Sequence, residues 1–141
     1  MHELLYCSCA SREISDTDIL DILEKARSFN TDNGITGILI YWIKTKQFMQ
    51  ILEGEKEVIF DLLEKIKNDE RHAGLKLVYD GEISERGFAK WSMGFLNFSS
   101  IDKSKLEGFS DILQKGFTDE ILKKEPSKTI TLFETFKELL P

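Results

Sequence analysis

The sequence predicts an α+β fold in which two helices pack on one face of a mostly antiparallel sheet. Two observations predict it. Short apolar segments bounded by polar residues recur along residues 1–100, as is typical of buried strands. Two longer stretches repeat apolar residues at helical spacing, and they alternate with the strands in the order strand–helix–strand–strand–helix–strand–strand.

The first two elements have the clearest local signals. Residues 3–10 form a short apolar segment, which predicts a buried strand. Ser15 can cap the following helix, and Asp18 stands three residues later, as in a capping box. Apolar residues then recur at helical spacing, so the helix is expected to run to about Asn30. Gly34 tolerates a positive φ and ends the helical stretch.

The remaining elements follow from the same two periodicities. They are a central strand at 35–43, a hairpin turn at 44–46, a returning strand at 47–52, a helix after Gly54 with a buried face from Val58 to Ile66, and strands at 75–79 and 91–98. This βαββαββ order is that of a ferredoxin-like fold. We expect one domain over residues 1–100. A C-terminal extension, 101–141, is expected to hold two short helices, around 106–113 and 130–140.

Composition limits the classes of function. Among 141 residues, 19 basic side chains face 25 acidic ones, and a net charge of −6 disfavours nucleic-acid binding. No apolar run approaches the ~20 residues that a membrane helix needs. The N-terminus has no secretory pattern, and only two cysteines are present, so we expect a cytoplasmic protein.

Three polar residues lie in segments that are otherwise apolar. Tyr6 lies on the first strand, Gln50 on the returning strand, and Asn30 at the end of the first helix. Buried polar groups are costly unless something satisfies them. Each of these groups alone could be satisfied by the backbone or by a neighbouring side chain, so none of them identifies a site by itself.

Taken together with their neighbours, these residues carry a family resemblance. The motifs are Tyr6, Asn30, Asn33-Gly-Ile-Thr-Gly37, Phe48-Met-Gln50, Leu52-Glu-Gly54, Asp69-Glu-Arg-His72 and Trp91-Ser-Met93. In this order, over residues 1 to about 100, they resemble the BLUF domains, the sensors of blue light using FAD. The fold of that family is also ferredoxin-like, in agreement with the order of elements above.

The resemblance implies that FAD binds noncovalently between the two helices. It assigns Ile22 and Ile66 to the two sides of the flavin ring, Asn30 to its polar edge, and Asp69, Arg71 and His72 to the ribityl and phosphate portion. Ile22 and Ile66 also lie on the predicted apolar helix faces, where plain core packing would equally account for them.

The resemblance also implies a photoswitch that is not an enzyme. Tyr6 would give an electron and a proton to the excited flavin, and Gln50 would rotate or tautomerise before both return. Trp91 and Met93, expected on one face of the last strand, would report the change outward. The output would be an unidentified partner protein or a change in homo-oligomeric state, transmitted by the C-terminal extension. We expect no attached output enzyme.

Two departures from the usual family pattern stand out. The hairpin after Tyr41 lacks a glycine turn and is expected to be longer, with Lys44 and Lys46 at its tip. Phe29 precedes Asn30 where a polar residue is common, which is expected to affect flavin affinity or recovery.

Three other functions would fit a protein of this size and fold. Cys7 and Cys9, with His2, could bind a soft metal, but three such ligands make a poor closed site. A small hydrolase on this fold would need an anion-binding loop, and no glycine-rich cradle is present. A relative that has lost its flavin would act as an interaction module, although Tyr6, Asn30 and Gln50 are all intact.

Overall fold

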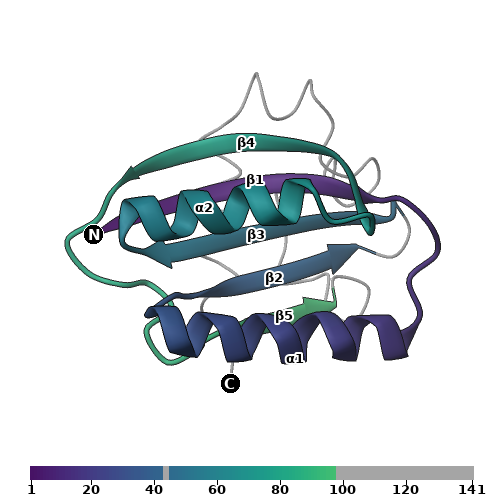
Figure 1. Ribbon diagram of the computed structural model, residues 1–141, viewed down its shortest axis with the longest axis horizontal. Helices are drawn as coiled ribbons and strands as arrows, with labels where there is room; N and C mark the ends of the chain where they lie inside the picture. Colours follow the sequence, from purple (N-terminus) through teal and green to yellow (C-terminus); the bar gives the residue numbers. More distant parts are fainter. Residues whose placement is uncertain (43–44, 98–141) are drawn as a thin grey trace, which may run out of the picture.

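The computed structural model describes residues 1–42 and 45–97 (Figure 1). In chain order the elements are β1 (His2–Ala10), α1 (Asp16–Asn33), β2 (Thr36–Trp42), β3 (Gln47–Gly54), α2 (Lys56–Lys67), β4 (His72–Glu82) and β5 (Gly94–Asn97). The predicted α+β class, the order of elements and the placement of both helices on one face of the sheet are confirmed. Both predicted C-terminal helices lie outside the described residues.

The five strands form one mixed sheet in the order β4-β1-β3-β2-β5. β1, β3, β2 and β4 pair antiparallel, whereas β5 pairs parallel to β2. β3 therefore lies in the middle of the sheet, between β1 and β2. The centre of β3 is therefore flanked by a paired strand on each side.

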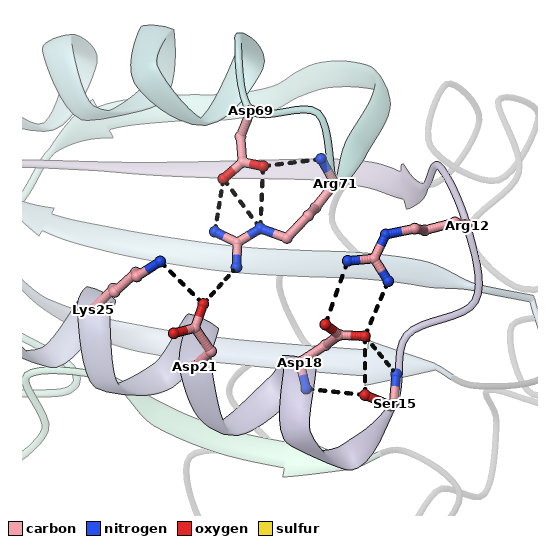
Figure 2. Close-up of polar contacts among 7 residues, drawn as sticks. All are labelled: Arg12, Ser15, Asp18, Asp21, Lys25, Asp69 and Arg71. Atoms are coloured by element: carbon pink, nitrogen blue, oxygen red, sulfur yellow. Dashed lines mark hydrogen bonds and ion pairs between the residues drawn. The ribbon is translucent and has the colours of Figure 1, made fainter.

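The start of α1 follows the local sequence signals. Ser15 accepts a hydrogen bond from the Asp18 backbone N–H at 3.1 Å, and the Asp18 carboxylate accepts one from the Ser15 backbone N–H at 3.0 Å (Figure 2). Arg12 adds an ion pair to Asp18 at 3.0 Å and holds the pKa of that carboxyl well below its usual range. The predicted capping box is thus confirmed, and Gly34 ends the helix at a φ of 66°.

The core between helices and sheet is built from alternate residues of the central strands. Leu4, Leu39, Phe48 and Leu52 are buried there with Tyr6, and they pack against Ile19, Leu23, Ile59 and Leu63 of the two helices. Ile22, Ala26, Phe29, Leu62 and Ile66 pack at its margin and are only partly buried. These partly buried apolar side chains lie on both helices and leave space for a ligand between α1 and α2.

Two strand boundaries differ from the prediction. β5 begins at Gly94, so the predicted strand from Trp91 starts three residues too early. The chain bends at Ser92 and Met93 before it enters the sheet. β4 is longer than predicted, since its pairing with β1 continues through two register shifts over His72–Glu82.

The remaining predictions fall close to the observed boundaries. The helix expected to end near Asn30 extends to Asn33, and the central strand starts one residue later than expected, at Thr36. Residues 43–44 of the hairpin lie outside the described residues, and Lys46 has a φ of 56°. No helix within the described part of the chain is long and apolar enough to cross a membrane.

Candidate functional site

A cavity of ≈ 200 Å³ lies between the two helices and the sheet. Its walls include every residue that the sequence assigned to flavin contact and both members of the predicted switching pair: Tyr6, Ile22, Asn30, Gln50, Ile66, Asp69, Arg71 and His72. Ile22 comes from α1 and Ile66 from α2, so the cavity has an apolar side chain on each side. The predicted residues therefore come together at one place.

Tyr6 and Gln50 form the floor of the cavity. They are direct register partners on β1 and β3, and the Tyr6 hydroxyl donates a hydrogen bond to Gln50 Oε1. Both side chains are buried, with exposures of 1 % and 4 %. Burial raises the pKa of the Tyr6 phenol well above its usual value, and the negative charge of Asp69 adds to the effect. Tyr6 is therefore held as a neutral phenol, whose hydroxyl donates a hydrogen bond to the amide oxygen.

The other end of the Gln50 amide contacts Met93. Gln50 Nε2 lies 3.2 Å from Met93 Sδ, and Met93 is 1 % exposed. Gln50 therefore accepts from Tyr6 at its oxygen and donates to a thioether at its nitrogen. A thioether is a weak acceptor, so this second bond restrains the amide only slightly.

Trp91 lies away from the amide. Its side chain is partly exposed and packs against Phe88, with ring centroids 6.5 Å apart. Because Trp91 and Met93 precede β5, strand alternation does not apply to them, and the expectation that they share one strand face is wrong. Of the two predicted reporters, Met93 contacts Gln50 in this structure.

Asn30 reaches the cavity from the last turns of α1 and is 1 % exposed. Its Nδ2 donates to the Ser92 carbonyl oxygen at 2.6 Å. Its buried Oδ1 has no hydrogen-bond partner among residues 1–42 and 45–97. An unpartnered buried oxygen is costly unless a ligand supplies a donor, so Asn30 is suited to accept a hydrogen bond from a polar group in the cavity.

Four charged residues lie where α1 faces the loop after α2 (Figure 2), and three of them, Lys25, Asp69 and Arg71, line the cavity. Arg71 pairs with Asp69 at 2.8 Å and reaches across to Asp21 of α1 at 3.2 Å. Lys25 pairs with the same Asp21 at 3.1 Å. The hydrogen bonds from Arg71 lower the pKa of Asp69 to about 2. The rim is thus an ordered network of two cations and two carboxylates, which suits the polar end of a ligand whose rings lie deeper.

His72 lies beside this network at the start of β4. Its Nδ1 is 2.7 Å from Ser8 Oγ, and its ring packs 4.8 Å from the ring of Phe48. Burial lowers the pKa of His72, and the nearby Asp69 charge partly opposes that effect. His72 is therefore held in its neutral form over a wider pH range than a free histidine.

The sequence missed several residues of the cavity. Lys25 of α1, Leu39 of β2 and Leu62 of α2 line it, together with Ala26, whereas Phe29, which also lines it, is linked to flavin affinity by the sequence. Lys25, Ala26 and Phe29 follow Ile22 at helical spacing, and this signal could have placed them on the same face. Leu39 is the register partner of Gln50, a pairing that the sequence alone does not fix.

The rival metal site is not assembled in this structure. Cys7 is buried and Cys9 is exposed, and no disulfide joins them. Within residues 1–42 and 45–97, no three metal-ligating side chains gather in one place. His2 instead hydrogen-bonds Asp80 at 2.9 Å.

The cavity suits a flat, largely apolar molecule with polar edges. It has aliphatic side chains on two sides, a phenol–amide pair on its floor, an unpartnered carbonyl oxygen at one end and cations at its rim. A flavin combines an aromatic ring system that carries N–H and C=O groups with an anionic tail. The residues present therefore fit a flavin.

Comparison with known proteins agrees with this geometry. The family model described as "Sensors of blue-light using FAD" matches residues 1–94. A photoactivated adenylate cyclase subunit beta of Euglena longa is 36 % identical over 91 residues. That match covers 64 % of this chain and 10 % of that protein, so the chain spans about a tenth of the length of this curated relative.

Two solved structures resemble the chain over most of their own length. The dark state of BlrB, a BLUF protein, has a TM-score of 0.80 at 25 % identity, and the match covers 99 % of this chain and 96 % of that one. The photo-activated state of BlsA has a TM-score of 0.68 at 33 % identity, covering 86 % and 89 % of the two chains. The family match over residues 1–94 and the Tyr6–Gln50 pair at the cavity floor lead to one conclusion: the chain belongs to the BLUF family, the flavin-binding sensors of blue light.

Proposed function

We propose that this chain is a blue-light photoreceptor that binds FAD noncovalently in the cavity between α1 and α2. The hydrogen-bonded series Tyr6–Gln50–Met93 at the cavity floor is the observation that carries the proposal. A series of this kind can be reorganised by rotation of the amide or by movement of a proton, with no net chemical change. The protein is therefore proposed to be a switch that catalyses no net reaction.

In this proposal different residues of the cavity hold different parts of the cofactor. Ile22 and Ile66 pack on the two sides of the ring system, and Asn30 Oδ1 accepts a hydrogen bond from its polar edge. Arg71 and His72, with Asp69, hold the ribityl and phosphate portion at the rim. Lys25 stands beside Arg71 through their shared partner Asp21 and adds a second cation there.

When bound, the flavin supplies the light absorption and accepts an electron in its excited state. Tyr6, which lines the cavity floor and bonds Gln50, would give an electron and its phenolic proton to the excited flavin. Both are taken back when the switch completes, so atoms and charges balance. Gln50 ends with a different amide orientation or tautomer, because either end of an amide can face Tyr6.

Met93 is proposed to carry the change away from the cavity. A rotated amide presents its oxygen to the thioether, and the 3.2 Å contact from Gln50 Nε2 is lost. Met93 lies immediately before β5, so a shift there moves the chain that leads into residues 101–141. We propose these residues as the output segment, which acts through an unidentified protein partner or through the homo-oligomeric state.

The test is an absorption spectrum of the purified full chain in darkness, under blue light and during recovery, with the released flavin identified by mass. The proposal expects bound FAD and a reversible red shift. Bound flavin that bleaches would indicate redox chemistry instead. A colourless protein that takes up no FAD on reconstitution would contradict the proposal and favour an interaction module.

A further inference from the structure

The segment that carries Met93 is held by three hydrogen bonds to three consecutive carbonyl groups. The Gly37 backbone N–H donates to the Trp91 carbonyl at 3.1 Å, and Asn30 Nδ2 donates to that of Ser92 at 2.6 Å. Arg27 Nε donates to the Met93 carbonyl at 3.0 Å. Arg27 and Asn30 are three residues apart on α1, so they reach this segment from one helix face.

Arg27 stands apart from the cavity itself. It does not line the cavity, and its residue is exposed, whereas Met93 is 1 % exposed and contacts Gln50. The contact through which Arg27 can act on the switch is therefore its hydrogen bond to the backbone of Met93. A fixed carbonyl restricts the position of the Met93 backbone. It therefore also restricts the geometry of the contact between Met93 Sδ and the Gln50 amide.

We propose that Arg27 is a positioning residue of the switch, whose Nε–H holds Met93 so that Sδ stays against Gln50. The positioning follows from the contacts within the chain. Its consequence for the response to light rests on the proposed function. The tether also links the buried amide to a charged side chain on the outer surface of α1.

Three substitutions separate the hydrogen bond from the charge. Gln places an amide nitrogen at the same position along the side chain as Arg Nε, so Arg27→Gln keeps a donor and loses the charge. Arg27→Lys keeps the charge but has a methylene at that position. Arg27→Met matches the length of glutamine and has neither the donor nor the charge. Lys67→Gln, which removes a charge from an exposed position at the end of α2, is the matched control.

The first measurement is the ¹³C-methyl NMR signal of Met93 in the flavin-loaded full chain, kept in the dark. We expect one sharp signal at the same shift in the unmodified protein, Arg27→Gln and Lys67→Gln. Arg27→Met and Arg27→Lys are expected to shift or split it. A Met93 signal that is unchanged in Arg27→Met, or that moves equally in Arg27→Gln and Arg27→Met, would overturn the inference.

The second measurement is the rate of dark recovery after blue light. Loss of the bond is expected to change the rate roughly threefold or more in Arg27→Met, with flavin content and melting temperature unchanged and Arg27→Gln close to the unmodified protein. Equal rates of dark recovery in all four variants would contradict the role of Arg27 in the switch. If the unmodified chain shows no light response, the proposed function fails, while the NMR comparison still decides the positioning.

Discussion

Tyr6 and Gln50 face each other directly across β1 and β3, and the Tyr6 hydroxyl donates to the Gln50 amide oxygen. The register of the two strands fixes this relationship, because directly opposed residues of an antiparallel pair project to the same face. A shift of one residue would turn either side chain to the other face of the sheet. The phenol–amide pair is therefore a consequence of strand pairing and does not depend on a loop.

Gln50 is also the midpoint of a polar series. Its oxygen faces Tyr6 and its nitrogen faces Met93, so the two ends of one amide contact groups of very different polarity. The bond to a phenol is stronger than the bond to a thioether. This asymmetry favours one amide orientation in the dark and makes the reversed one a distinct state.

Replacing Met93 tests the reporter end of this series. Met93→Leu keeps the volume but removes the sulfur acceptor, so flavin binding should persist while the light-induced shift or its recovery rate changes. Met49→Leu, at a residue that is equally buried at 1 % but projects to the opposite face of the sheet from Gln50, is the control. Trp91→Phe should have the smaller effect, and a larger effect of Trp91→Phe than of Met93→Leu would contradict the assignment. Difference spectra under blue light measure both.

Asn30 is expected to contribute to flavin affinity. Asn30→Ala removes the unpartnered Oδ1 and should weaken FAD binding roughly tenfold, the effect of losing one buried hydrogen bond. Asn33→Ala, in an exposed residue of the same helix whose amide bonds the Phe29 carbonyl, should leave affinity unchanged. Quenching of FAD fluorescence on titration measures both. Equal affinities in the two variants would exclude a direct contact from Asn30.

Gly37 is required by close packing of the backbone. A Cβ at this position would lie 2.0 Å from the Ile51 carbonyl oxygen, so Gly37→Ala should lower the free energy of unfolding by about 2 kcal/mol or more. Gly34→Ala meets nothing within 4 Å and is strained only by its φ of 66°, which costs about 1 kcal/mol. Urea denaturation should rank the two in that order, and the reverse order would refute the argument.

His72 predicts a specific pH dependence of stability. Burial lowers its pKa in the folded state below the ordinary value of 6.5. The unfolded chain therefore binds the proton first as the pH falls, so the contribution of His72 is complete above 6.5 and is lost below it. The melting temperature should fall less steeply from pH 7.5 to 5.5 in His72→Asn than in the unmodified protein. Parallel slopes would show that His72 is not the group responsible.

Local signals predicted the parts of the fold that depend on neighbours in sequence. The Ser15–Asp18 capping box and the left-handed Gly34 were both predictable, because each acts within one turn of chain. The start of β5 was not. The carbonyl groups of the three residues before it accept hydrogen bonds from Gly37, Asn30 and Arg27. These contacts arise only when distant segments meet.

The candidate site likewise combines features that local sequence predicts with features that depend on contacts between distant segments. Ile22 and Ile66 could be placed on helix faces from their spacing, and the polar residues Tyr6, Asn30 and Gln50 were conspicuous in apolar surroundings. The unpartnered oxygen of Asn30 and the contact between Gln50 and Met93 could not be predicted, since both depend on register and on the bend at Ser92. The ion pairs of Asp21 with both Lys25 and Arg71 could likewise not be predicted from the sequence.

The most direct test of the photoswitch is to compare two buried tyrosines under blue light. Tyr6→Phe removes the phenol that bonds Gln50, whereas Tyr41→Phe removes one that is equally buried, at 2 %, but does not line the cavity. Both variants should bind flavin. The account predicts that Tyr41→Phe retains the reversible red shift and Tyr6→Phe loses it. A full red shift in flavin-loaded Tyr6→Phe would contradict the central claim that the Tyr6–Gln50 pair is the switch.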